Sequence, residues 1–313
     1  MRKVLVTGGA GFIGSHVVDA LVRRGDQVRV LDNLCTGNLA NLAEVRERIE
    51  FIEADLNDAP AVARAVAGAD CIFHEAALAS VPRSVERPLD THAACVTGTL
   101  VLLDAARKAG VRRLVYAASS SAYGNQPAAS KRESDLPMPI SPYGAAKVAA
   151  EYYCQAFAAM EEIETVALRY FNVFGPRQDP NSEYSAVIPR FITLMLGDKR
   201  PTIFGDGYQS RDFTFVGDIV AGNLLAADAP NVSGRVFNIA TGHQVNLLEL
   251  IAALNRLLDT DVAPIFAPAR TGDVRESLAD ITLARQHLRY EPSIRFDEGL
   301  RRSIDYYCSL VKK

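Results

Sequence analysis

The sequence lacks several features that mark common classes of protein. Its five cysteines (Cys35, Cys71, Cys95, Cys154 and Cys308) have no close pairs, which argues against a zinc site or a disulfide framework and fits reduced thiols in a cytoplasm. The histidines do not cluster either, so we expect no metal site. No apolar run reaches the roughly 20 residues that a membrane span needs. The apolar run after the basic N-terminus is too short for a signal peptide.

A strong charge of either sign is also missing. The net charge of −3 gives no reason to expect nucleic acid or an anionic membrane as a partner. The 313 residues are 49% hydrophobic and 23% charged, which is ordinary for a globular protein, and they can form one large domain or two lobes.

A glycine-rich turn follows the first apolar run. Lys3 to Thr7 predicts a buried strand, and Gly8, Gly11 and Gly14 precede a helical pattern that extends to Leu21. In a strand–turn–helix, such glycines permit a tight turn, close approach of a pyrophosphate, and close packing of the helix on the strand. The helix N-terminus would then face the pyrophosphate with its free amides.

A carboxylate stands where a dinucleotide ribose would be bound. The apolar run from Gln27 to Leu31 ends at Asp32, about 20 residues after the glycines, where it can bind both hydroxyls of an adenosine ribose. Because this carboxylate would repel a 2′-phosphate, the pattern favours NAD over NADP. The alternative for Asp32 is a helix cap or a turn residue.

Strands and helices then alternate along the chain. Further elements are predicted at Ile49–Glu53, Pro60–Val66, Cys71–His74, Ala94–Lys108 and Arg113–Ala117. This order predicts an α/β fold with a parallel, doubly wound sheet, in which ligands bind beyond the carboxyl ends of the strands. Ser119 follows a strand at that end and should face the cofactor. The alternative is that Ser119, Ser120 and Ser121 simply form a turn.

Tyr143 and Lys147 are four residues apart, and on a helix they share a face. An ammonium held beside a phenol favours the phenolate and lowers a pKa that is about 10 when unperturbed. With a serine to orient a substrate oxygen, the pair would take a proton from an alcohol near neutral pH. Since this spacing often arises by chance, an amphipathic pair on a surface helix is the alternative.

Together these motifs resemble the extended short-chain dehydrogenase/reductase superfamily. Within it the chain resembles the NAD-dependent UDP-hexose 4-epimerases, most closely the UDP-N-acetylglucosamine 4-epimerases. The segments that support the resemblance are His74–Ala77, Val81–Ser84, Arg169–Gly175, Gly205–Gly207, Gln209–Phe213 and Gly272–Arg275.

The resemblance implies a Rossmann-type sheet with a smaller α/β substrate-binding lobe, and an NAD that is tightly bound and not consumed. Tyr143 would be the base, Lys147 its activator and a ligand of the nicotinamide ribose, and Ser119 a hydrogen-bonding partner of the reacting oxygen. The other implied cofactor contacts are Gly8, Gly11, Phe12, Ile13, Gly14, Asp32, Asn33, Asp55, Leu56, Ala76, Ala77 and Tyr170.

For the substrate, the resemblance implies that Asn172 binds the diphosphate or the sugar. Arg211 and Arg270 would neutralise the diphosphate, as arginine suits paired phosphate oxygens, although a surface cation is the alternative for either. Asp273 would hold the uridine ribose. The remaining implied contacts are Ser80, Ser120, Ser121, Tyr143, Val187 and Ser277.

One position departs from the family pattern. Cys95 stands where the family usually has an asparagine that touches the cofactor. A thiol is a poor hydrogen-bonding group, so we leave Cys95 out of the site and consider apolar packing as its alternative role.

The serine run indicates which reaction to expect. Related dehydratases and decarboxylases usually carry a glutamate in this run, whereas residues Ser119 to Gly124 contain no acid. A 4,6-elimination needs a carboxylate for a second proton, so the run favours an epimerase. The resemblance implies that C4 loses a proton and a hydride, passes through a 4-keto sugar that turns over, and receives the hydride on its other face.

The sugar is predicted from Ser277, because the family places a pocket-lining residue there. A small side chain admits an N-acetyl group, which favours interconversion of UDP-N-acetylglucosamine and UDP-N-acetylgalactosamine, with UDP-glucose and UDP-galactose as further substrates. The alternative is an ordinary surface serine. Rival functions are a UDP-glucuronate 4-epimerase, a nucleotide-sugar reductase and a non-catalytic dinucleotide sensor.

We expect residues 1–172 to form the NAD-binding domain, with a return of the chain at about 213–241. Residues 173–212 and 242–313 would form a discontinuous lobe that binds the nucleotide sugar. Strands are predicted at Ile203–Phe215 and Arg235–Thr241, beside the segments that carry substrate contacts. The helices near Ala94–Lys108 and Tyr143–Met160 are apolar on more than one face. The resemblance implies a homodimer joined by a four-helix bundle, and burial within the monomer is the alternative.

Overall fold

The computed structural model describes residues 1–180, 187–269 and 275–311. Its centre is a parallel sheet built from β1 (Lys3–Thr7), β2 (Gln27–Asp32), β3 (Ile49–Glu53), β4 (Cys71–His74), β5 (Arg113–Ser119), β6 (Glu164–Tyr170) and β11 (Arg235–Ile239). The seven strands lie in the order β11-β6-β5-β4-β1-β2-β3. The order reverses beside β1, which is the arrangement that opens a ligand crevice at the carboxyl ends of the strands.

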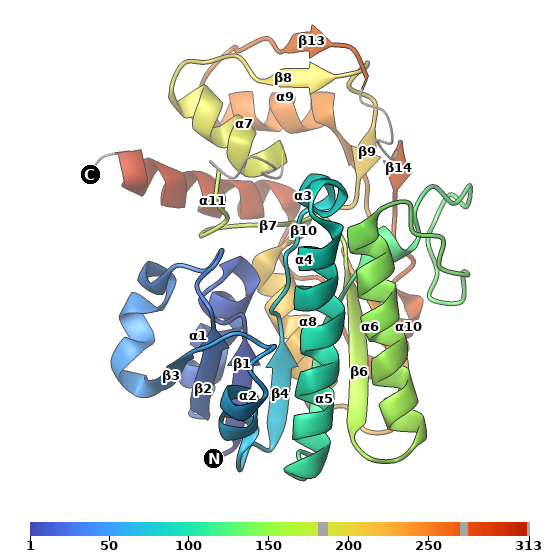
Figure 1. Ribbon diagram of the computed structural model, residues 1–313. Coiled ribbons are helices and arrows are strands. Elements are labelled where there is room, and N and C mark those ends of the chain that lie inside the picture. Colours follow the sequence, from blue (N-terminus) through green and yellow to red (C-terminus); the bar gives the residue numbers. More distant parts are fainter. Residues whose placement is uncertain (181–186, 270–274, 312–313) are drawn as a thin grey trace.

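Helices cover both faces of this sheet (Figure 1). They are α1 (Phe12–Arg24), α2 (Ala59–Val66), α5 (Gly98–Lys108), α6 (Pro142–Ala159) and α8 (Val216–Asp228). Successive side chains of a strand point to opposite faces, so Val4 and Val6 pack with α1 and α8, while Leu5 packs with α2 and α5. This confirms the predicted doubly wound α/β fold.

Short elements connect these layers. They are η1 (Leu39–Arg48), α3 (Val81–Glu86), α4 (Pro88–His92), the π-helical turn η2 (Ala93–Thr97) and the short turn η3 (Ser120–Ala122). The predicted helix 94–108 is therefore a π-helical turn followed by α5. Among the described residues, no helix is both long enough and apolar enough to cross a membrane.

A smaller α/β lobe lies beyond the carboxyl ends of the strands (Figure 1). Its elements are β7 (Val173–Phe174), α7 (Val187–Leu196), β8 (Thr202–Phe204), β9 (Ser210–Arg211), β10 (Thr214–Phe215), β12 (Val245–Asn246), α9 (Leu247–Leu258), β13 (Ile265–Ala267), β14 (Glu276–Ser277) and α11 (Phe296–Val311). Phe174, Phe191 and Leu250 belong to one buried cluster that holds this lobe together. The smaller lobe was predicted.

Two details differ from the sequence-based expectations. The single strand expected at 203–215 is three short strands, because Gly205 and Gly207 have φ values of +91° and +83°, which interrupt an extended backbone. Helix α10 (Thr282–Leu288) falls in the segment expected to belong to the lobe, yet its Ala284 and Leu288 pack in the same core as α8. The domain boundaries themselves stay predictions.

Candidate functional site

The glycine turn between β1 and α1 leaves no room for side chains. Gly8 has a φ of +68°, and a Cβ there would lie 2.6 Å from the backbone of Ala76. A Cβ on Gly14 would lie 2.1 Å from the carbonyl oxygen of Gly8. Gly11 is the N-cap of α1, and Phe12 opens the helix. The backbone is thus bare at a helix N-terminus, which is the arrangement that binds a pyrophosphate.

Asp32, the last residue of β2, is buried beside this turn. Its carboxylate accepts hydrogen bonds from the backbone N–H groups of Ala10 at 2.9 Å and Leu34 at 2.8 Å. Burial raises its pKa, and those two hydrogen bonds act in the opposite direction. Carboxylate oxygens have several lone pairs, so Asp32 keeps acceptor capacity for ribose hydroxyls.

The next strand end adds a polar pair. Asn33 donates to the Asp55 carboxylate at 2.6 Å. Burial would raise the pKa of Asp55, but hydrogen bonds from Asn57 and Asn33 outweigh it and lower the pKa. Leu56 is buried and packs against Gly98 at the start of α5. These groups lie on the Asp32 side of the sheet, as expected for an adenosine site.

Tyr143 is positioned by hydrogen bonds at the start of α6. The Ser141 hydroxyl caps the helix by accepting from the N–H of Gly144 at 3.1 Å. The buried Ser84 of α3 accepts from the N–H of Tyr143 at 3.1 Å and donates to the carbonyl of Val81. The start of α6 at Tyr143 is therefore held by its own N-cap and by α3, and Ser84 is a positioning residue to which the sequence assigned no role.

Lys147 and Ser119 flank Tyr143 as the helical spacing predicts. Lys147 is only 3% exposed, donates to the carbonyl of Ala117 at 2.7 Å and lies 4.9 Å from the centre of the Tyr116 ring. Burial lowers its pKa. Ser119 ends β5, accepts from the N–H of Ser121 at 3.1 Å and hydrogen-bonds the side chain of Tyr143.

Burial raises the pKa of Tyr143 above its usual value, and the hydrogen bond from Ser119 acts to lower it. In the protein chain by itself the pKa of Tyr143 is therefore raised and not lowered, so Lys147 does not overcome the desolvation of the phenolate. The physical reason is that desolvation of the phenolate outweighs the other effects, while the ammonium of Lys147 is engaged by Ala117. A further positive charge at the site would be needed to favour the phenolate.

His74 and Cys95 are buried, and their contacts indicate a role in packing and hydrogen bonding within the fold. Both ring nitrogens of His74 are engaged, at 2.7 Å from the Thr7 hydroxyl and 2.8 Å from the Thr99 hydroxyl. Burial lowers the pKa of His74 to about 3, so the ring is neutral. Cys95 is buried in the π-helical turn and packs with Val96 and Ala146, which fits the apolar role considered for it.

A buried carboxyl group is the feature that the sequence did not single out. The Tyr170 hydroxyl donates to Oε1 of Glu75 at 2.9 Å, and Asn223 of α8 donates to the Tyr170 hydroxyl at 2.7 Å. Oε2 of Glu75 is buried without a hydrogen-bond partner among the described residues. Ala76 and Ala77 follow Glu75 directly, and the backbone of Ala76 contacts Gly8.

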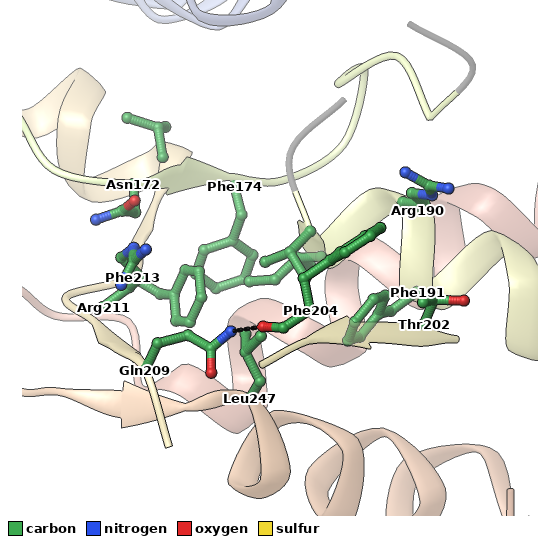
Figure 2. A pocket seen from close by; sticks show the side chains of 13 residues that line it. Asn172, Phe174, Arg190, Phe191, Thr202, Phe204, Gln209, Arg211, Phe213 and Leu247 are labelled. Carbon is green, nitrogen blue, oxygen red and sulfur yellow. Dashed lines mark hydrogen bonds between the residues drawn. The ribbon is translucent and has the colours of Figure 1, made fainter. Parts of the chain in front are cut away.

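A cavity of about 270 Å³ lies in the smaller lobe (Figure 2). Its walls are mainly apolar and include two arginines. The lining residues are Asn172, Val173, Phe174, Val187, Ile188, Arg190, Phe191, Thr202, Phe204, Gln209, Arg211, Phe213 and Leu247. Asn172, Val187 and Arg211 were predicted from the sequence. Phe204 and Gln209 were not, and the Gln209 amide donates to the carbonyl of Phe204 at 2.6 Å.

Asn172 and Arg211 lie at the same end of this cavity (Figure 2). Asn172 has a φ of +31°, which asparagine tolerates better than most residues, and its amide donates to the carbonyl of Asp212 at 3.4 Å. Arg211 of β9 pairs in register with Ser277 of β14. Ser277, the residue predicted to select the sugar, is thus next to Arg211, a predicted ligand of the diphosphate.

The remaining predicted residues are placed as follows. Ser80 caps α3 by accepting from the N–H of Arg83 at 3.2 Å, so it shares a helix with Ser84. Ser120 and Ser121 lie in the turn after β5. Arg270 and Asp273 lie outside the described residues. Among the described residues, no group of three acidic, histidine or cysteine side chains could hold a metal ion.

Two observations indicate that NAD fits the region around the glycine turn and the ends of β1 and β4. The glycine turn is a cradle that a Cβ at Gly8 or Gly14 would fill. The buried Oε2 of Glu75 is a polar atom whose partner the protein does not supply among its described residues.

Comparisons with known proteins also indicate an NAD-dependent enzyme. Residues 4–240 match the NAD dependent epimerase/dehydratase family. The chain is 39% identical to a UDP-glucose 4-epimerase of Mycolicibacterium smegmatis, over 97% of this chain and 98% of that one. A UDP-N-acetylglucosamine 4-epimerase of Methanobrevibacter ruminantium M1, solved with UDP-N-acetylmuramic acid, is 39% identical with a TM-score of 0.95 and 99% of both chains covered.

A UDP-glucose 4-epimerase of Thermotoga maritima, solved with UDP-glucose, is 38% identical, with a TM-score of 0.94 and 99% of both chains covered. Similarity at this level extends over both lobes. The chain therefore belongs to the NAD dependent epimerase/dehydratase family, within the extended short-chain dehydrogenases/reductases, and is an NAD-dependent UDP-sugar 4-epimerase, an isomerase.

Proposed function

We propose that this enzyme interconverts UDP-N-acetylglucosamine and UDP-N-acetylgalactosamine, and acts on UDP-glucose and UDP-galactose as a second pair. The observation that carries the proposal is the position of Ser277 on β14, in register with Arg211, which is one of the residues that line the cavity. A serine there leaves space beside the diphosphate site, whereas a large aromatic side chain would occupy it. Similarity alone does not choose the sugar, because relatives named for either sugar are about equally close.

The UDP group occupies the lobe cavity in this proposal. Phe191, Phe204 and Phe213 give it apolar walls suited to a flat uracil ring. Asn172 and Arg211, at one end, would bind the diphosphate, since a guanidinium pairs well with phosphate oxygens. Arg270 and Asp273 keep their predicted roles at the diphosphate and the uridine ribose.

The chemistry would take place where Ser119 hydrogen-bonds Tyr143. Tyr143 removes the proton of the sugar 4-hydroxyl and later returns it, while Ser119 orients the 4-oxygen. NAD, when bound, supplies the hydride acceptor and donor, and its positive ring adds the charge that the phenolate needs. Lys147, fixed by Ala117, supplies a second positive charge and a donor to the nicotinamide ribose.

A panel of UDP-sugars, without added cofactor, tests the proposal. The purified enzyme should convert UDP-N-acetylglucosamine at C4, followed by NMR, and should also convert UDP-glucose. A UDP-glucuronate-only enzyme would convert neither. A reductase would need NADH or NADPH in amounts equal to the product.

Ser277→Tyr should remove activity on the N-acetylated pair by about tenfold or more, and should keep activity on UDP-glucose, because the ring would fill space that the N-acetyl group needs. Ser277→Ala is the matched control and should keep both activities. If Ser277→Tyr epimerises the N-acetylated sugar at the original rate, Ser277 does not select the sugar.

We also propose a homodimer. Helices α4 and α6, which contact each other, carry the exposed side chains of Leu89, Tyr152 and Tyr153, which are 82%, 48% and 39% exposed. Large exposed apolar side chains that gather on one face favour association with a second copy. Helices α5 and α6 of each copy would form the four-helix bundle.

A further inference from the structure

The carboxyl group of Glu75 has an unusual environment for an acid that the proposed proton transfer does not use. Its Oε1 accepts from Tyr170 at 2.9 Å, and Asn223 holds that hydroxyl at 2.7 Å. Its Oε2 is buried and has no hydrogen-bond partner among the described residues. Three elements, β4, β6 and α8, therefore converge to fix one acid whose second oxygen is left for another partner.

The sheet order shows which half of the cofactor lies near this acid. Asp32, at the end of β2, marks the adenosine side, and the glycine turn after β1 marks the pyrophosphate. Glu75 follows β4 and Tyr170 ends β6, both on the opposite side of β1 from Asp32. The cofactor runs across the ends of the strands, so its nicotinamide half lies on the side of Glu75.

The environment of Glu75 places its pKa near neutral pH, so a nearby charge can change its protonation state. Burial raises its pKa to about 7, while the hydrogen bond from Tyr170 and the positive charge of Lys147 on α6 act to lower it. The neighbouring His74 is neutral and bonded to Thr7 and Thr99. A positive charge brought close to this acid would favour its carboxylate form, and the carboxylate would in turn favour that positive charge.

We propose that Glu75 is the counter-charge of the oxidised cofactor. Its carboxylate, held by Tyr170, stabilises the positively charged nicotinamide of NAD relative to the neutral ring of NADH. The resting enzyme therefore keeps its cofactor oxidised and ready to accept a hydride. This inference rests on NAD binding and not on which UDP-sugar the lobe takes, so it can fail or succeed independently of the proposed substrate.

The test measures which redox form of the cofactor the enzyme prefers. Wild-type enzyme and Glu75→Gln are equilibrated with defined mixtures of NAD and NADH, separated from free cofactor, and the bound ratio is measured from NADH absorbance and total nicotinamide. Glutamine keeps the acceptor for Tyr170 but cannot carry the charge. The preference for NAD should fall about tenfold or more in Glu75→Gln, as one pKa unit of interaction corresponds to tenfold.

Glu133→Gln is the matched control. Glu133 is also a partly buried acid whose pKa burial raises, but it accepts from the backbone N–H of Asn238 on β11, the edge strand separated from β1 by β6, β5 and β4. Its change to glutamine should leave the bound ratio of NAD to NADH at the wild-type value.

The wild-type enzyme provides a second readout that needs no variant. Its preference for NAD should weaken as the pH falls from about 8 to about 6, because Glu75 is then protonated in the NADH complex. Glu75→Gln should lack this dependence, although Lys147 and Tyr170 remain. An unchanged ratio in Glu75→Gln overturns the proposal. If that variant shifts only the pH profile of turnover, Glu75 serves Lys147 and not the cofactor, and the proposal is wrong.

Discussion

Tyr143 has a pKa raised by burial, and yet it is the residue proposed to act as a base. The two facts are compatible if positive charge arrives with the cofactor and adds to that of Lys147. Ser84 and Ser141 fix the backbone around Tyr143 before any ligand binds. The geometry is thus set by the protein, whereas the protonation state depends on the charges assembled at the site.

Lys147→Met tests this division at the residue scale. Only the phenolate can accept a proton, so the rate should rise with pH until Tyr143 is ionised. Removing the positive charge of Lys147 should raise the pKa of Tyr143 in the holoenzyme and move the rising limb of kcat/KM upward by about one pH unit or more. The measurement is the pH profile of C4 epimerisation.

Tyr143→Phe is the companion variant and should lose about 10²-fold or more of the rate at every pH, with UDP binding retained. A Lys147→Met profile that coincides with the wild-type profile would show that the lysine charge does not tune the base.

At the scale of elements, α6 carries the proposed base and is fixed to the sheet by an ion pair. Glu151 lies one turn after Lys147, is 1% exposed, and accepts two hydrogen bonds from Arg169 of β6 at 2.7 and 2.9 Å. Arg169 also lies 4.7 Å from the centre of the Tyr123 ring. This pair joins the helix with Tyr143 to the strand that ends at Tyr170.

Glu151→Ala should destabilise the enzyme by about 3–5 kcal/mol, because it leaves the buried charge of Arg169 without its partner. Denaturant unfolding of the holoenzyme measures this. Glu298→Ala is the matched control: Glu298 pairs with Arg301 and Arg302 at the surface, where solvent screens the charges, so the variant should stay close to wild-type stability. Similar losses in the two variants would mean that the buried pair does not anchor α6.

The elements also show what a sequence can predict. The bounds of β1, β3 and β4 equal the predicted ones: β1 and β4 are short runs of mainly apolar residues, and β3 has three apolar residues interspersed with two glutamates. The predicted strand 203–215 failed because positive φ at Gly205 and Gly207 breaks it, and a glycine alone does not reveal its φ. The π-helical turn at Ala93–Thr97 has no sequence signal that we recognise.

At the scale of the whole molecule, the sheet with its glycine turn and the smaller lobe with its cavity meet at the carboxyl ends of the strands. Motifs within one segment, such as the glycine turn or Tyr143 and Lys147, were predictable because their geometry is local. The Glu75–Tyr170–Asn223 network was not, since its members come from three elements that only folding brings together. The same holds for Phe204 and Gln209 in the lobe cavity.

The proposed dimer belongs to this scale. Tyr152→Glu places a charge on the exposed face of α6, where a second copy would exclude water, and should convert a dimer to a monomer in light scattering after gel filtration. Tyr208→Glu is the control, since Tyr208 is 62% exposed on the lobe, and it should leave the mass unchanged. A wild-type enzyme that is monomeric at micromolar concentration contradicts the proposal.

The measurement that tests the account most directly follows the hydrogen at C4. UDP-N-acetylglucosamine carrying deuterium at C4 is incubated with the holoenzyme in ordinary water, and the product is examined by NMR. If the hydrogen leaves as a hydride and returns within the same site, the epimerised product keeps its deuterium. Replacement of that deuterium by solvent hydrogen would contradict hydride transfer, and with it the roles given to Tyr143 and to the bound NAD.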